Sequence, residues 1–466
     1  MSERESVGFF GDPRRAERGA LIFERIVASG SLTIRKIGES RAGEMGVHRF
    51  LSAPEVTERE ILATLAARTA AACAGRRIVA VQDTSEINFR GRDRGRKGLG
   101  RGGDGEGLGF FLHPVIAVDA ADELVLGLLD AQIWTRRPED DGSACRERRR
   151  RPLAAKESHR WLAGACAAAE RAHAAAELIV IGDRESDLYG VFAGRPANAQ
   201  LVVRAAQDRL LDDAGRLFAR AEAWPELQSE TIRLPSRGPG DKGRDATVAL
   251  RAGPVCIKRP VNGFDPNDPP SVALTLVEAR ETAPPDDVPP LHWRLLTTLP
   301  VPDGKAASEI VGLYRLRWRI EQVFRALKSD GLGLPDVQVQ DAERLFKLAA
   351  LGLGAAVRTI QLVDARDGGP RPASDVADQG LVEAAEAIGP TLEGKTERQR
   401  NPHPARSLAW LAWIAARLGG WNCYYKPPGP KTMRSGWDRL AAMAAGYAIA
   451  QERAAANAHA SSQGNA

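Results

Sequence analysis

Apolar residues between positions 313 and 327 recur at spacings of three, four and seven, which predicts an amphipathic helix over Tyr314–Lys328. In one continuous helix, Glu321 shares a face with Tyr314, Arg317 and Lys328, which lie seven before, four before and seven after it. A single carboxylate among cations and a phenol fits a metal ion beside a phosphate. It fits a solvated, salt-bridged surface equally well, because Glu and Arg are common on exposed helix faces.

Two stretches of β-forming aliphatic residues each end on an aspartate, Arg77–Asp83 and Glu177–Asp183. Further β-forming runs predict additional strands, and an Asp-rich turn between the runs at 110–118 and 124–134 indicates a hairpin. These strands are expected at 110–118, 124–134 and 201–204, and from Trp293 onward, with another at 84–89. Short alternating runs among prolines and glycines predict a β-rich insertion over 208–292.

Helical patterns occupy most of the remaining chain. They predict helices at about 13–28 (opened by Asp12-Pro13), 41–51, 57–74, 154–176, 342–362, 407–418 and 437–456. Residues 364–406 are rich in Pro, Gly and charge, and are expected to form a linker with one short helix. The apolar pair of helices at the C-terminus fits either a docked subdomain or an oligomer contact.

Composition narrows the class of protein. A length of 466 residues corresponds to about three domains. The net charge of +5 is compatible with a nucleic-acid partner without requiring one. Five scattered cysteines without a CxxC pair argue against a disulfide framework or a zinc site and fit a reducing cytosol. A charged N-terminus and Ala-rich apolar stretches interrupted by charge predict neither a signal peptide nor a membrane span.

The acids suggest a common chemistry. Asp83 and Asp183 both follow strands, and in open α/β sheets catalytic groups gather at such strand ends. Two aspartates and Glu321 supply the oxygen ligands that Mg²⁺ prefers, and two such ions would activate an attacking oxygen and stabilise a leaving one. Arg317 and Lys328 would then hold the phosphates on either side of the scissile bond.

The spacing of Tyr314, Arg317, Glu321 and Lys328 is that of a known signature, Y-x2-R-x3-E-x6-K. In this respect the chain resembles bacterial DDE transposases of the insertion-sequence-four group, Tn-five type, which cut and paste through a hairpin intermediate. Further stretches are similar to the same family. They are VQDTS around Asp83, GDRESD around Asp183, GDPRRAER at 11–18, HRFL at 48–51, KESHRWL at 156–162 and ARLGGW at 416–421.

The resemblance implies an α/β fold with a ribonuclease-H-like catalytic core over 61–365, interrupted by the β-rich insertion. It implies a small helical N-terminal unit (1–60) that binds DNA ends, and a linker with a helical C-terminal dimerisation region (366–466). Asp83, Asp183 and Glu321 would be the catalytic residues and would bind two Mg²⁺ ions, for which Mn²⁺ can substitute. The partners would be double-stranded DNA, at transposon ends and target, and a second copy of the chain, with no membrane.

The resemblance also implies DNA-binding residues beyond Tyr314, Arg317 and Lys328. Trp293 stands 21 residues before Tyr314, where the family carries a tryptophan that packs on a flipped base. Matching basic positions are Arg184, Arg204 and Arg325 in the core, and Arg18 and Arg49 in the N-terminal unit. Trp161 and Trp318 are assigned to the core, and no role is assigned to His113.

Two alternatives of a different kind stay open. A catalytically silent DNA-binding protein or inhibitor derived from a transposase would keep the fold without the reaction. A stand-alone Mg²⁺-dependent nuclease would not need the basic N-terminal unit or the terminal helices. In each case a cytoplasmic location in a bacterium is expected, in contact with the nucleoid for a DNA-bound protein.

Overall fold

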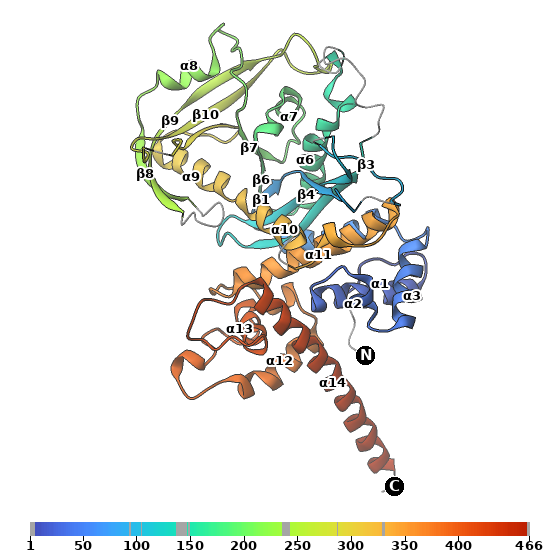
Figure 1. Ribbon diagram of the computed structural model, residues 1–466. Helices are drawn as coiled ribbons and strands as arrows, with labels where there is room; N and C mark the ends of the chain where they lie inside the picture. Colours follow the sequence, from blue (N-terminus) through green and yellow to red (C-terminus); the bar gives the residue numbers. More distant parts are fainter. Residues whose placement is uncertain are drawn as a thin grey trace.

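The computed structural model describes residues 5–92, 95–103, 105–136, 147, 150–234, 243–286, 288–328 and 331–463. Within these ranges, eleven strands form one mixed sheet (Figure 1). The strands are β1 (Arg77–Gln82), β2 (Ser85–Asn88), β3 (Gly100–Arg101), β4 (Leu108–Asp119), β5 (Val125–Trp134), β6 (Glu177–Gly182), β7 (Gln200–Arg204), β8 (Gln228–Leu234), β9 (Arg244–Lys258), β10 (Ser271–Glu281) and β11 (His292–Thr297).

The centre of the sheet has the order β5-β4-β1-β6-β7. The β4–β5 hairpin is antiparallel, and β4 pairs antiparallel with β1, while β1, β6 and β7 are parallel neighbours. An antiparallel hairpin beside three parallel strands is consistent with the expected ribonuclease-H-like core. The hairpin was predicted from two β-forming runs around an Asp-rich turn, and the strands before Asp83 and Asp183 from runs of aliphatic residues, and the structure confirms them.

The β-rich segment extends the central sheet. After β7 the chain forms β8, β9 and β10, and then returns with β11, which pairs antiparallel with both β7 and β10. Because β11 closes directly onto β7, the inserted strands lengthen the sheet on the side of β7. Trp293, on β11, is therefore carried to the edge of the central strands.

The helices enclose the sheet and continue beyond it. They are α1 (Pro13–Ser29), α2 (Ile34–Gly38), α3 (Arg41–Ser52), α4 (Glu58–Cys73), α6 (Arg160–Arg171), α7 (Tyr189–Ala193), α8 (Leu217–Glu222), α9 (Gly304–Arg315), α10 (Trp318–Lys328), α11 (Ala342–Ala365), α12 (Gln379–Leu392), α13 (Leu408–Leu418) and α14 (Pro430–Gln463). The expected helix at 154–176 is shorter than predicted, because residues before Arg160 form the short 3₁₀ turns η2 (Leu153–Ala155) and η3 (Glu157–His159).

Alternation along the central strands separates two hydrophobic cores. Val79 and Val81 pack in the core that contains α10 and α11, whereas Ile78 and Ala80 pack in the core that contains α6. This follows from the pleat, since successive side chains of a strand point to opposite faces. A residue just beyond the end of β1 continues this alternation. Odd-numbered positions therefore face the layer of α10 and α11, and even-numbered positions face the layer of α6.

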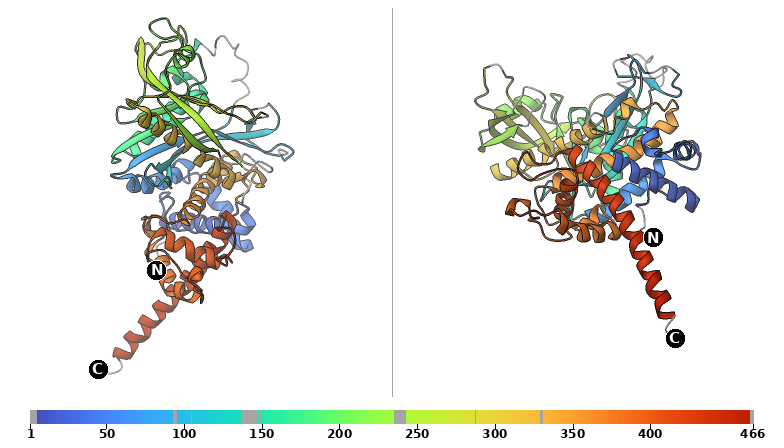
Figure 2. Two further views of the ribbon diagram at one scale, coloured as in Figure 1. Left: turned by 90° about the vertical axis from the view of Figure 1, so that its left-hand side faces the viewer. Right: turned by 60° about the horizontal axis from the view of Figure 1, so that its bottom comes forward.

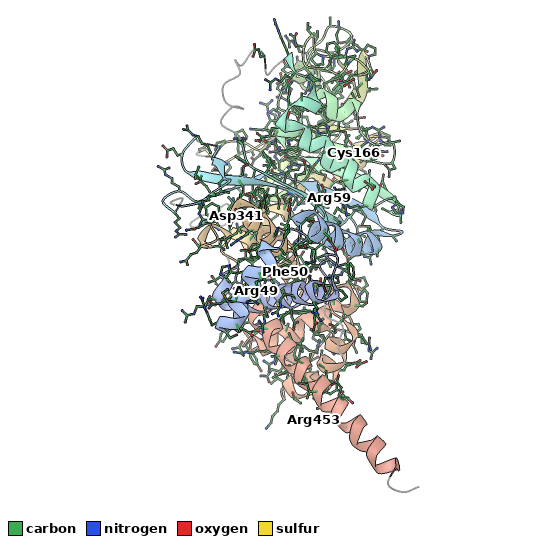
Figure 3. The ribbon with its side chains drawn as sticks, turned by 90° about the vertical axis from the view of Figure 1, so that its right-hand side faces the viewer. Arg49, Phe50, Arg59, Cys166, Asp341 and Arg453 are labelled. Carbon is green, nitrogen blue, oxygen red and sulfur yellow. The ribbon has the colours of Figure 1, made fainter. Side chains whose placement is uncertain are left out.

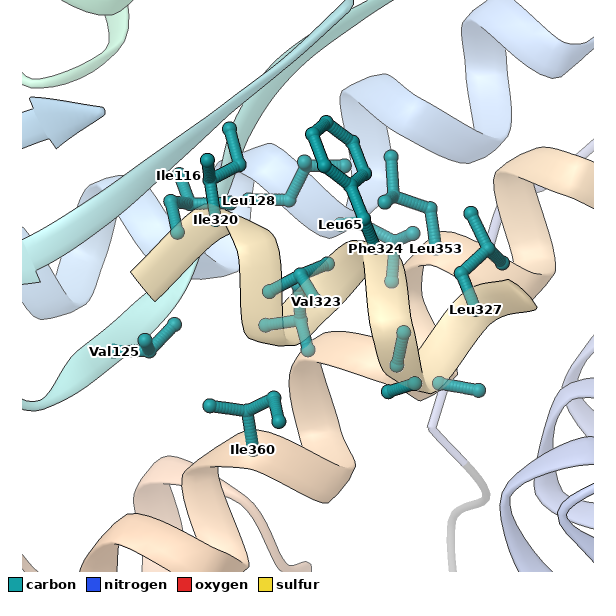
Figure 4. Packing of buried hydrophobic residues seen from close by; sticks show 14 of the residues in the cluster. Leu65, Ile116, Val125, Leu128, Ile320, Val323, Phe324, Leu327, Leu353 and Ile360 are labelled. Atoms are coloured by element: carbon teal, nitrogen blue, oxygen red, sulfur yellow. The ribbon is translucent and has the colours of Figure 1, made fainter. Parts of the chain in front are cut away.

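Helix α10 is seated by its apolar stripe. Ile320, Val323, Phe324 and Leu327 lie against strands β4 and β5, against Leu65 of α4 and against α11 (Figure 4). Burial of each large apolar side chain contributes roughly 1.5–3 kcal/mol. The opposite side of α10 is therefore left to carry the polar residues, Glu321 among them.

The central helix α11 is long and apolar enough to cross a membrane by length and composition alone. In the structure 89% of its most apolar 18-residue stretch is buried within the protein. Helices α1, α4, α10, α13 and α14 and strand β5 contact it. Such burial is typical of the core helix of a folded domain.

The segment before α13 is more ordered than a linker. It contains the 14-residue helix α12, which packs on α13 and α14. It also contains Arg371, which is only 2% exposed. The composition of 364–406 did not reveal these contacts, because they are made with elements distant in sequence. Helix α14 then runs away from the body of the protein (Figures 1 and 2).

Candidate active site

Asp83 and Asp183 follow neighbouring parallel strands in matched register. Val81 of β1 pairs with Ile181 of β6, and each aspartate lies two residues further along its strand. Adjacent strands are about 4.8 Å apart, so the register brings the two acids side by side. Asp83 lies two residues after Val81, and Asp183 two residues after Ile181, so both aspartates lie on the face of the sheet that α10 covers.

Local hydrogen bonds fix each aspartate. The Thr84 N–H donates to Asp83 Oδ1 at 2.8 Å, and the Glu185 N–H donates to Asp183 Oδ1 at 2.8 Å. Gly182, just before Asp183, is required by close approach, because a Cβ there would stand 2.1 Å from Ser186 Oγ. Both carboxylates are therefore held before any ligand arrives.

The prediction of one continuous helix over Tyr314–Lys328 is wrong, although Arg317 still lies beside Glu321, four residues later. Helix α9 ends at Arg315 and α10 begins at Trp318. Between them the bonds shorten to the i→i−3 type: Leu316 to Leu313, Arg317 to Tyr314 and Arg319 to Leu316. A 3₁₀ turn has three residues per turn instead of 3.6, so the positions of Tyr314 and Glu321 around the helix axis differ from those in one continuous helix.

Arg317, in this turn, joins the sheet to α10. Its Nη1 lies 2.8 Å from Asp83 Oδ2 and 3.6 Å from Glu321 Oε1. The Asp83 side chain is 14% exposed, whereas that of Glu321 is 40% exposed. Burial, and then the charge of Asp183, raise the pKa of Asp83 to about 7, against the opposing effect of Arg317.

Tyr314, Arg204 and Trp293 form the wall of a groove beside these acids. The rings of Trp293 and Tyr314 meet edge to face, with centroids 5.4 Å apart. Arg204, at the end of β7, bonds the Tyr314 phenol and donates from Nη2 to the His292 carbonyl at 3.3 Å. Arg317 and Trp318 line the same groove, whose volume is about 410 Å³.

Three other basic residues of the catalytic domain were predicted to bind DNA, and they lie in different surroundings. Lys328 ends α10, where burial lowers its pKa while the charges of Glu86 and Glu321 oppose that shift. Arg184 is exposed in the 3₁₀ turn η4 (Arg184–Ser186) that follows Asp183. Arg325 lines a neighbouring cavity with Arg366 and Asp364, so the structure does not bring it into the groove of Arg317.

Arg18 and Arg49 belong to the N-terminal helices α1 and α3 and not to this centre. Both are exposed, and Arg18 passes over Gly46 of α3. Arg49 lies next to the buried Phe50, whose ring packs on Phe10 (Figure 3). Their predicted contact with DNA ends stays a prediction.

The three acids supply the kind of oxygen ligand that a divalent ion needs, but their side chains are not close enough together in this structure to share one ion. Hard cations such as Mg²⁺ prefer carboxylate oxygens, and Asp83 feels the charges of both Asp183 and Glu321. Among the described residues, no three His, Cys, Asp or Glu side chains are close enough together to hold one ion as they stand. The guanidinium of Arg317 lies between Asp83 and Glu321 and supplies the positive charge in this arrangement.

Comparison with known families identifies the class of protein. The sequence matches the transposase DDE domain family over residues 112–357, more than half of the chain. The chain belongs to this family. The matched part of this DDE transposase includes Asp183 and Glu321 and begins after Asp83. The family implies nuclease or strand-transfer chemistry on DNA, and DDE transposases generally use divalent metals.

Two features of this DDE transposase were not assigned from its sequence. Trp318, expected in the core, is only half-buried and lines the groove, whereas Trp161 is fully buried as expected. Arg160 bonds side chains next to both aspartates. The only signal for Arg160 was its position within KESHRWL, which indicates resemblance but no contact.

Proposed function

We propose that this protein is an active DNA transposase whose catalytic residues are Asp83, Asp183 and Glu321. The observation that supports this most strongly is the matched register of β1 and β6, together with Arg317, which bridges Asp83 and Glu321. Arg317, which contacts Asp83 and Glu321, also lines the neighbouring groove that Arg204 and Tyr314 share. A salt-bridged surface without function would not explain why two of the acids end adjacent parallel strands.

The reaction would be metal-dependent phosphoryl transfer. Asp83, Asp183 and Glu321 would hold two Mg²⁺ or Mn²⁺ ions, which when bound activate the attacking oxygen and stabilise the leaving one. For Glu321 to contribute an oxygen beside Asp83, Arg317 has to give up its present ion pairs. Arg317 can then neutralise a phosphate of the bound strand, as guanidinium groups do well.

The proposed sequence of steps begins at the transposon end. Water attacks the phosphorus, and a 3′-OH leaves. That 3′-OH attacks the opposite strand and forms a hairpin, a second water opens the hairpin, and the same 3′-OH finally joins target DNA. Each step exchanges one phosphoester bond for another or for a P–O bond to water, so no oxidant or energy carrier is required.

The groove would hold the distorted DNA end. Hairpin formation needs room, and flipping a base out provides it at a cost of a few kcal/mol of unstacking. Trp293 lines the groove at its contact with Tyr314, so its ring can stack on the extruded base. Tyr314, Arg204, Arg184 and Lys328 would hold nearby phosphates, with Arg325 on the adjacent cavity.

The flanking regions would bind the ends and pair two subunits. Residues 1–60 would recognise the terminal inverted repeat through Arg18 and Arg49, both exposed. The C-terminal helices would join two copies, which the exposed apolar side chains of Met443 and Ile449 on the projecting α14 support. These finer features, with the hairpin route, are those of the insertion-sequence-four group and its Tn-five type.

The test is a cleavage assay with the purified chain and a labelled duplex carrying the inverted repeats that flank its gene. With Mg²⁺ we expect a nick, then a hairpin, then a double-strand break and joined product, and no reaction in EDTA. Specific binding of the ends without cleavage in Mg²⁺ or Mn²⁺ would indicate the silent derivative. Cleavage of any duplex regardless of its ends would indicate a stand-alone nuclease.

A further inference from the structure

Arg160, the first residue of α6, lies between the two segments that follow the aspartates. Its Nε donates to Thr84 Oγ1 at 2.8 Å, and its Nη2 donates to Glu185 Oε2 at 2.5 Å. The Arg160 side chain is only 10% exposed. A planar guanidinium with donors in fixed directions can make two such bonds at once, whereas a lysine has a single nitrogen.

The two residues that accept from Arg160, Thr84 and Glu185, each hold one of the two aspartates. Thr84 and Glu185 are the residues whose N–H groups donate to Asp83 Oδ1 and Asp183 Oδ1, each at 2.8 Å. Each aspartate is therefore held by a backbone N–H, and the side chain of that same residue is held by Arg160. Thr84 faces α6 because its parity is opposite to that of Asp83.

His113 completes the arrangement on the side of Thr84. The Thr84 hydroxyl accepts from Arg160, so its own proton is available to His113 Nδ1 at 2.9 Å. The other ring nitrogen, Nε2, then donates to Gln82 Oε1 at 3.1 Å. The ring is fully buried, and burial lowers the pKa of His113 to about 3, so it stays neutral and Nδ1 can accept.

The guanidinium itself has little freedom. Nη1 donates to the Glu157 carbonyl at 3.3 Å, and the group lies within 6 Å of the rings of Trp134 and Trp161. Glu157 is in turn paired with Arg136 through two bonds of 2.8 and 2.9 Å. Arg160 thus connects a supported loop to both aspartate segments.

We propose that Arg160 is a positioning residue, which holds the Asp83 and Asp183 segments at one fixed separation for the reaction proposed above. It touches neither carboxylate, so it acts through Thr84 and Glu185. Two acids that share metal ions have to be placed within about half an ångström, and side chains bonded by a supporting layer achieve this. This role rests on the proposed function for its purpose, but its structural effect is measurable without DNA or metal.

The experiment measures amide hydrogen exchange on the full-length chain, without metal, in Arg160→Ala, Arg160→Lys and Arg171→Ala. Arg171 is the last residue of the same helix and serves as the matched control. In Arg160→Ala we expect at least tenfold faster exchange in 84–86 and in 185–187, with α11 unchanged. In Arg160→Lys one of the two segments should stay protected, and Glu185→Gln should loosen only the second segment.

A cleavage assay on the same variants gives the functional consequence. We expect Arg160→Ala to lower the rate of the chemical step at least tenfold while the Kd for DNA ends changes less than twofold. Unchanged exchange in both segments of folded Arg160→Ala would overturn the proposal, as would faster exchange throughout the chain, which marks general destabilisation. Full cleavage by Asp183→Ala would instead refute the proposed function and leave the exchange result standing.

Discussion

The candidate active site has a sheet side and a helix side, and the two are held by different interactions. On the sheet side, Asp83 and Asp183 are fixed by strand register and by backbone N–H donors at 2.8 Å. On the helix side, Glu321 is 40% exposed, and its ion pair with Arg317 has a separation of 3.6 Å. The two aspartates are therefore held by direct hydrogen bonds, whereas Glu321 is placed by the packing of α10 and has a longer ion pair with Arg317.

Arg317 contacts both sides from the turn between α9 and α10. A continuous helix would keep Arg317 on the face of Glu321, four residues apart. The 3₁₀ turn before α10 leaves Arg317 3.6 Å from Glu321 and also places its guanidinium 2.8 Å from Asp83. In this arrangement Arg317 is a counter-ion of the acids, and the proposed function requires it to become a ligand of phosphate.

The largest effects are expected from removing an acid on either side. Asp183→Ala and Glu321→Ala should each lower strand cleavage at least a thousandfold, because two-metal chemistry needs both positions. Binding of DNA ends should change only a few-fold. Gel-based cleavage and filter-binding assays measure the two quantities, and cleavage near the wild-type rate in Mg²⁺ by Glu321→Ala would exclude the helix side from the centre.

Replacement of the bridging cation should have a smaller effect. We expect Arg317→Ala to slow cleavage about 10- to 100-fold and to reduce the salt slope of DNA binding by about one, the value for one lost phosphate contact. Lys305→Ala, a change of an exposed cation in the first turn of α9, is the control. An unchanged salt slope would mean that Arg317 stays with Asp83 and does not contact phosphate.

Trp293 tests whether the groove acts after the first cut. Trp293→Ala should nick DNA at a rate near that of wild type but form hairpins about tenfold more slowly, since only the hairpin step needs an extruded base. Trp293→Phe keeps an aromatic face and should recover part of the loss. Single-turnover gels resolve the two products, and an equal fall in both would point to packing against Tyr314 instead.

The pH dependence of stability should separate the two sides without DNA. The pKa of Asp83 in the folded protein is about 7, above its ordinary value, so the folded state favours the protonated carboxyl. The contribution of Asp83 to the free energy of unfolding is therefore complete below about pH 4 and is lost as the pH rises through 7. In metal-free buffer, Asp83→Asn should therefore be more stable than wild type at pH 8, by a few kcal/mol at most. Urea unfolding at pH 5 and 8 measures this, and an equal difference at both pH values would contradict the raised pKa.

The smallest effect is expected at Arg325. Because it lines the cavity with Arg366 and Asp364 and not the groove of Arg317, Arg325→Ala should change cleavage and DNA affinity about two- to threefold. Titration of a labelled duplex gives the affinity. A loss as large as that of Arg317→Ala would show that the DNA path extends across the outer face of α10.

The sequence was most informative where local pattern and structure coincide. Short runs of aliphatic residues predicted β1 and β6, and the aspartates that follow them, because strands buried on both faces are apolar throughout. The Asp12-Pro13 pair predicted the start of α1, where the Asp12 side chain accepts from the Arg14 N–H. In these places the determining interactions lie within a few residues.

Prediction failed where contacts distant in sequence decide the structure. The apolar period continues through Leu313 and Leu316, so nothing local reports the turn that sends Arg317 to Asp83. The half-exposed position of Trp318 and the bonds of Arg160 depend on the packing of separate layers. Arg371 likewise donates to the carbonyl of Val125 on β5, which is distant in sequence.

If Asp83, Asp183 and Glu321 form one metal centre, iron-promoted cleavage of the protein should cut the chain beside all three residues. Fe²⁺ bound in place of Mg²⁺ generates radicals that cut the nearest backbone when ascorbate and peroxide are added. We expect cuts clustered near residues 83, 183 and 321, which added Mg²⁺ suppresses and which Asp183→Ala abolishes. Cuts elsewhere, or a pattern unchanged in Asp183→Ala, would contradict a shared metal centre.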